Sequence, residues 1–109
     1  MSEWRVEVTW EAGVGELDND ELLKLVEAAD TERGWFAARW ADGAGVEISS
    51  YEQGRTGVDA LMLFGPAVRA WMAARGLAGT VVSARACLPE VFEREAMRPT
   101  PDGYEARRR

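Results

Sequence analysis

The stretch GWFAARWADGAGVEISSY, residues 34–51, predicts a β-hairpin at the centre of the fold. Its two ends are rich in apolar residues, so one strand is expected over about residues 35–40 and another over about 46–51. The link between them, ADGAG, consists of residues that are small or tolerate a left-handed backbone. This order of apolar run, glycine-containing link and apolar run is typical of two antiparallel neighbours.

The five-residue link also predicts which residues of the hairpin face each other. With this loop length, Trp40 is expected opposite Val46, and Trp35 opposite Tyr51. Because successive side chains of a strand point to opposite faces, Trp35 and Trp40 are expected on different sides of the sheet. We therefore expect Trp40 in the core, and Trp35, Tyr51 and Arg39 on the open face.

Before the hairpin, the sequence predicts one strand and one helix. Residues 3–10 alternate strictly between polar and apolar side chains, which is the period of a strand buried on one face. Asp18 and Glu21 have the spacing of a capping box, in which each side chain accepts a backbone N–H of the other residue. A helix is therefore expected over about residues 19–30.

After the hairpin, a second helix is expected over about residues 56–75, because a capping pair precedes a long apolar periodicity. Residues 80–88 alternate as a last strand, and a short helix is expected over about 89–97. Gly65 and Pro66 fall in the middle of the second helix. We expect them to kink or split it, because an interior proline removes a hydrogen bond and its ring clashes with the preceding turn.

The order of these elements, βαββαβ, resembles that of the ferredoxin-like fold. This resemblance implies an α+β sandwich with a four-stranded antiparallel sheet and two helices on one face. We expect residues 1–97 to form this single domain, with the short C-terminal helix at its end. Residues 98–109, RPTPDGYEARRR, have two prolines and no periodicity and are expected to be a flexible, disordered, Arg-rich tail.

Composition excludes several kinds of chemistry. The 109 residues include no histidine and one cysteine, Cys87, so one chain has no histidine base, no disulfide and no Cys/His zinc site. We find no nucleophile–base pair, metal motif or phosphate loop, and expect no catalytic residues and no cofactor. The net charge of −6 argues against nucleic acid as a partner. Without a long apolar run or a signal peptide, we expect no membrane association and a cytoplasmic location.

The second helix carries two apolar stripes, although a helix that covers a sheet needs only one. We expect one stripe to face the sheet; it consists of Val58, Leu61, Met62, Gly65, Val68 and Met72. The second stripe, with Phe64, Ala67 and Trp71, is then surplus. It is either covered by the C-terminal segment or available for contact with another chain, because large exposed apolar patches are rare on monomers.

The same choice applies to the aromatic pair expected at the end of the hairpin. Trp35 and Tyr51 either cover each other as a cross-strand pair or serve as anchors in an interface. A single-stranded RNA site is disfavoured, because Glu3 and Glu7 are expected on the same face of the sheet, where such sites carry basic residues.

Surplus apolar surface without a catalytic constellation favours a non-enzymatic protein–protein interaction or assembly module. We expect a homo-oligomer or a subunit of a larger complex, held through Phe64, Ala67 and Trp71 and through the open face. The alternative is a small-ligand sensor or a cofactor-free enzyme of the dimeric α+β barrel type. In that case Trp40, Tyr51, Arg39 and Met62 would line a cavity.

Overall fold

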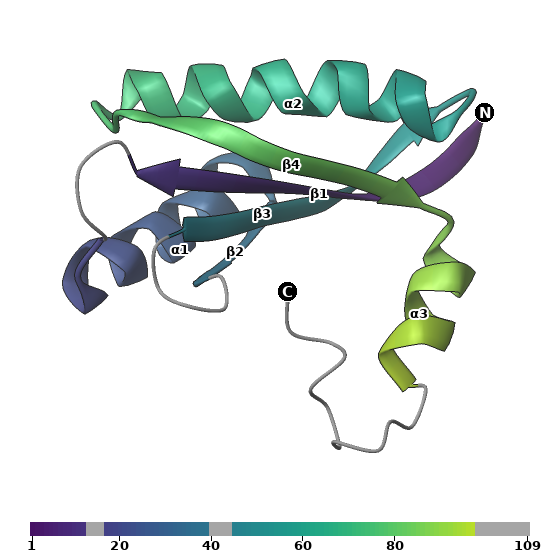
Figure 1. The fold of residues 1–109 in the computed structure, drawn as a ribbon, viewed down its shortest axis with the longest axis horizontal. Coiled ribbons are helices and arrows are strands. Elements are labelled where there is room, and N and C mark those ends of the chain that lie inside the picture. Colours follow the sequence, from purple (N-terminus) through teal and green to yellow (C-terminus); the bar gives the residue numbers. More distant parts are fainter. Residues whose placement is uncertain (13–16, 40–44, 98–109) are drawn as a thin grey trace.

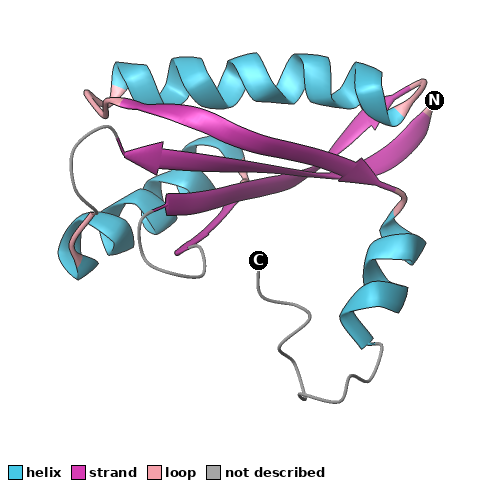
Figure 2. Cartoon of the chain, in the orientation of Figure 1, coloured by secondary structure: helices cyan, strands magenta, loops and turns pink. Residues whose placement is uncertain are grey.

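The computed structural model describes residues 1–12, 17–39 and 45–97, which form four strands and three helices (Figure 1). The strands make one antiparallel sheet in the order β2-β3-β1-β4 (Figure 2). This confirms the α+β class and the four-stranded antiparallel sheet. Trp40 and the C-terminal tail lie outside the described residues. The elements are β1 (Ser2–Ala12), α1 (Asn19–Arg33), β2 (Phe36–Arg39), β3 (Gly45–Gly54), α2 (Gly57–Ala74), β4 (Gly79–Cys87) and α3 (Pro89–Met97).

The expected capping box begins α1. The Glu21 backbone N–H donates to Asp18 Oδ1 at 2.8 Å, and the Asp18 N–H donates to Glu21 Oε1 at 3.4 Å. These bonds satisfy backbone donors that the first helical turn leaves without partners. Gly34 ends the helix in the left-handed conformation, at φ 68°, which glycine adopts without a steric penalty.

Helix α2 is continuous through Pro66, so of the two expected outcomes, a kink or a split, the split is wrong. Thr56 caps the start of the helix, since its Oγ1 accepts the Asp59 N–H at 3.1 Å, and the helix extends over 18 residues from Gly57 to Ala74. Pro66 lies on the exposed side of the helix. The Met62 carbonyl, which lacks its usual donor at residue 66, can therefore bind water instead of being buried without a partner.

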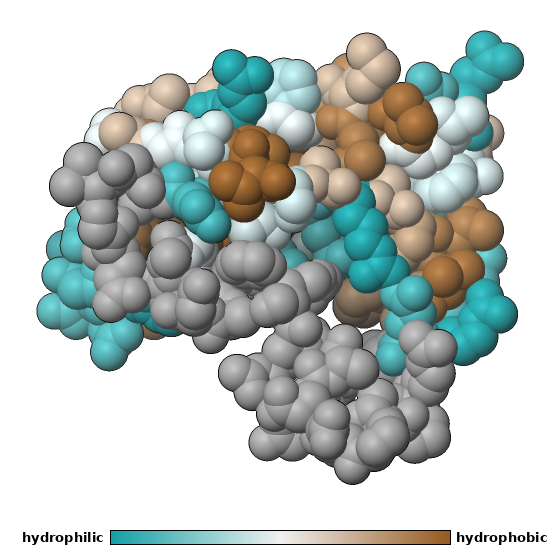
Figure 3. Space-filling view, in the orientation of Figure 1, coloured by the Kyte–Doolittle hydropathy of each residue, from teal (hydrophilic) through white to brown (hydrophobic). Residues whose placement is uncertain are grey.

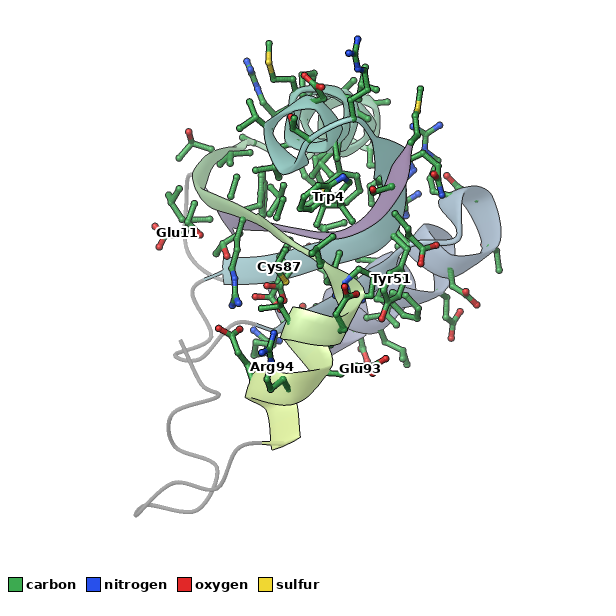
Figure 4. All side chains as sticks on the ribbon, turned by 90° about the vertical axis from the view of Figure 1, so that its right-hand side faces the viewer. Trp4, Glu11, Tyr51, Cys87, Glu93 and Arg94 are labelled. Atoms are coloured by element: carbon green, nitrogen blue, oxygen red, sulfur yellow. The ribbon has the colours of Figure 1, made fainter. Side chains whose placement is uncertain are left out.

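The sheet and the first two helices enclose one hydrophobic core. The expected alternation of β1 is confirmed, since its even-numbered residues face this core and Val6 and Val8 are fully buried. Figure 4 shows Trp4 between β1 and α2, and its Nε1 donates to the Gly54 carbonyl at 3.1 Å. Both helices reach the same cluster. From α1 come Leu25 and Ala29, and from α2 come Ala60, Phe64, Val68, Trp71 and Met72.

The hairpin register differs by one residue from the expected one. Ala37 pairs with Ile48, and Phe36 pairs with Ser49. A shift of one residue exchanges the two faces of a strand, so Phe36 takes the open-face position and Trp35 turns to the core. The physical reason is the size of Trp35: the register that buries this indole removes more apolar surface from water than the pairing with Tyr51 would.

Candidate protein interaction surface

The aromatic residues expected to be surplus on α2 lie in the core. Phe64 is 2% exposed, Trp71 is 8% exposed, and Ala67 packs against the same cluster. Trp35, expected on the open face, is 5% exposed. Its ring meets Phe64 and Trp71 edge to face, with centroids 5.2 and 5.7 Å apart. The stripe is therefore covered within the chain, but by Trp35 and not by the C-terminal segment, which was the cover expected from the sequence. The expected position of Trp35 on the open face is wrong.

A hydrogen bond from Trp71 fixes the end of α1 against α2. The Trp71 Nε1 donates to Glu32 Oε1 at 3.0 Å, and the other carboxylate oxygen of Glu32 lies 3.4 Å from Arg75 Nη1. The indole N–H is thus satisfied although the ring is buried, which removes the usual penalty for burying a polar group. This arrangement gives Trp71 a structural role.

The apolar surface of α2 that remains exposed is on the opposite side of the helix. Val58 is 66% exposed, Met62 69% and Leu63 71%, which are high values for large apolar side chains. Figure 3 shows hydrophobic residues gathered over the N-terminal half of α2, along the upper edge of the molecule. We call this surface the outer face of α2. It consists of Val58, Asp59, Met62, Leu63, Pro66, Arg69, Ala70 and Ala73, all exposed.

A shallow groove continues the outer face toward the start of β4. It is lined by Pro66, Ala70 and Ala73 from the helix and by Leu77 and Gly79 beyond it. Arg69 also lines it. The apolar surface available to a partner therefore extends past the helix itself.

Tyr51 lies on the open face of the sheet, in a different cluster from the expected one. The Arg5 guanidinium lies 5.1 Å from the Tyr51 ring, 5.5 Å from Phe36 and 4.5 Å from Phe92. We call these four residues the Arg5 cluster. Arg5 Nη2 donates to Ser49 Oγ at 2.9 Å, while Arg5 Nε is buried without a hydrogen-bond partner among the described residues. Cation–π attraction to the three rings compensates for this missing bond.

The Arg5 cluster attaches α3 to the sheet, because its Phe92 ring comes from α3 and its other three residues come from strands. An ion pair between Arg85 of β4 and Glu95 of α3 adds a second contact, and the hydrogen bond from Arg85 to Glu95 raises the pKa of Arg85. Sequence reasoning missed Phe36 and Phe92. Part of the cluster could have been found from the strand order. Once β1 is placed beside β3, Arg5 pairs directly with Tyr51.

Replacement of Phe92 should release α3 without unfolding the sheet. We expect Phe92→Ala to increase amide hydrogen exchange over residues 89–97 about tenfold, because one cation–π contact and the burial of a ring are lost. Glu93→Ala, an exposed change on the same helix, is the matched control and should leave the rates unchanged. Equal rates in the two variants would contradict the docking role of Phe92.

The remaining expected site residues do not converge on a cavity. The expected position of Arg39 on the open face is wrong, because in the shifted register Arg39 pairs with the buried Val46 and is on the helix side of the sheet. There its Nη2 donates to Asn19 Oδ1 at 3.1 Å, which ties the hairpin to the start of α1. Tyr51 is on the open face of the sheet, whereas Met62 is on the outer face of α2. The cavity proposed for a sensor or a dimeric α+β barrel is therefore not formed by these three side chains.

Residues 1–12, 17–39 and 45–97 give little support for a reactive cysteine, a metal site or a membrane-spanning helix. Burial raises the pKa of the Cys87 thiol against the opposing effect of Arg85, so the thiol stays protonated and weakly nucleophilic at neutral pH. In this part of the chain, no group of three acidic or cysteine residues could hold a metal ion. The helices described there are also too short or too polar to cross a bilayer.

Comparison with known proteins found no matching family model, no similar curated protein and no similar solved structure.

Proposed function

We propose that this chain is a non-enzymatic protein–protein interaction module, which acts as a homo-oligomer or as a subunit of a larger complex through the outer face of α2. The observation that carries the proposal is the high exposure of Val58, Met62 and Leu63, three large apolar side chains within two turns of one helix. Apolar surface in water costs about 25 cal/mol per Å², and a partner that covers it removes this cost. The acidic composition supports a protein partner over nucleic acid.

The scaffold that presents this surface is, we propose, a ferredoxin-like βαββαβ sandwich. The strand order β2-β3-β1-β4 supports this arrangement, as does the common core that α1 and α2 share on one face of the sheet. In such a two-layer fold, a helix needs only its inner stripe for the core. The apolar residues on the outer side of α2 therefore have no use within the sandwich, which supports an intermolecular role.

The test of this function is the particle size of the protein in extracts of cells that produce it. We expect the wild type to elute larger than a monomer, and Met62→Glu to elute as a monomer, because a buried unpaired carboxylate opposes association strongly. Leu23→Glu is the matched control, since Leu23 is an equally apolar residue on α1 that is 58% exposed. Its particle size should equal that of the wild type.

Two results would contradict this function. One is a wild-type protein of monomer size, and the other is a Met62→Glu variant that stays in the same particle as the wild type. Circular dichroism of the purified variants establishes that each is folded.

A further inference from the structure

The charges on the outer face of α2 are arranged so that the face complements itself. Asp59 and Arg69 are its two charged residues, and both are exposed. Asp59 lies five residues before Phe64 and Arg69 lies five residues after it. At a rise of 1.5 Å per residue, each is about 7.5 Å along the axis from the level of Phe64.

We propose that the partner of this face is the same face of a second copy of the chain, packed antiparallel about a two-fold axis at the level of Phe64. Asp59 of each copy then lies at the level of Arg69 of the other. A shallow crossing of about 20°, common for long helix pairs, keeps the two side chains within reach. This inference rests on the proposed function and names the partner of that surface.

The apolar residues agree with the same register. Met62 of one copy comes to the level of Pro66 of the other, and Val58 to the level of Ala70. Large side chains therefore stand at the levels of small ones, which allows two helices to approach closely.

The charge pattern discriminates against the other arrangements of two copies. In a parallel pair, Asp59 would lie beside Asp59 and Arg69 beside Arg69, which repels at both ends. The antiparallel pair turns both repulsions into attractions. A self-complementary patch is what a two-fold interface requires, since each residue is used twice. A partner with an unrelated sequence would not require Asp59 and Arg69 to lie at equal distances on either side of Phe64.

Charge reversal with mixing tests the arrangement by sedimentation equilibrium of the full chain. We expect Asp59→Arg and Arg69→Asp each to weaken self-association at least tenfold, because each places two like-charge pairs in the dimer. An equimolar mixture of the two variants should regain association close to that of the wild type. In the mixed dimer, the new arginine meets the new aspartate, and the native Asp59 meets the native Arg69.

The outcomes separate this inference from the proposed function. Restored association in the mixture, with each variant weak alone, supports the antiparallel pair. A mixture no heavier than its components overturns it, and so does a wild type that stays monomeric when purified. If the antiparallel pair fails while Met62→Glu still loses its large particle in cell extracts, the outer face binds a different protein and the proposed function stands. Leu23→Glu again serves as the control.

Discussion

Phe64→Ala is expected to lower the free energy of unfolding by about 3–5 kcal/mol, the usual cost of replacing a buried phenylalanine. Phe64 is 2% exposed and meets the Trp35 ring at 5.2 Å. Its neighbour Leu63 is 71% exposed, so Leu63→Ala should change stability by less than about 0.5 kcal/mol. Urea denaturation at concentrations where the chain is monomeric measures both values.

The reverse result would mean that α2 is turned about its axis relative to the arrangement described above. If Leu63→Ala were costly and Phe64→Ala nearly neutral, the aromatic stripe would face outward and the outer face would be the core side. The two residues are adjacent on one helix and both are large and apolar. Their difference therefore reports on orientation and is insensitive to helix propensity or to the general stability of the fold.

Features that depend on local interactions were predictable from the sequence. The capping pair Asp18 and Glu21 was found at the start of α1, because both partners lie within one turn of the helix. The alternation of residues 3–10 predicted which side of β1 faces the hydrophobic core, because the side-chain period of a strand is local. It did not predict that Glu7 and Thr9 on the other side are also buried, at 4% and 3% exposed. The class and the strand composition of the sheet follow from such patterns.

Features that depend on distant partners were not predictable in the same way. Both apolar stripes of α2 were visible in the sequence, but the burial of the second one depends on Trp35, which lies outside the helix and covers Phe64 and Trp71. Hydrophobic periodicity gives the angle between two stripes and contains no information on which distant residues cover them. The candidate site thus moved to the other side of the expected helix, while the surplus of apolar residues on that helix was foreseen.

The Arg5 cluster makes contacts within the monomer, whereas the outer face is available for contact with another chain. In the Arg5 cluster, the rings surround a cation of the same chain and one of them belongs to α3. Its contacts are thus used within the monomer. On the outer face, Val58, Met62 and Leu63 expose most of their surface. The two surfaces therefore predict different phenotypes: changes in the cluster loosen α3, and changes on the outer face alter association.

Trp35→Ala should have an effect as large as that of Phe64→Ala, a loss of about 3–5 kcal/mol in the free energy of unfolding. Trp35 is 5% exposed and touches two aromatic rings, whereas Phe36 is 55% exposed and contacts the Arg5 guanidinium at 5.5 Å. Phe36→Ala should therefore cost only about 0.5–1 kcal/mol. Urea denaturation of this pair measures the hairpin register directly, because a shift of one residue would exchange the two values. A larger loss for Phe36→Ala than for Trp35→Ala would restore the pairing of Trp35 with Tyr51 and return Trp35 to the open face.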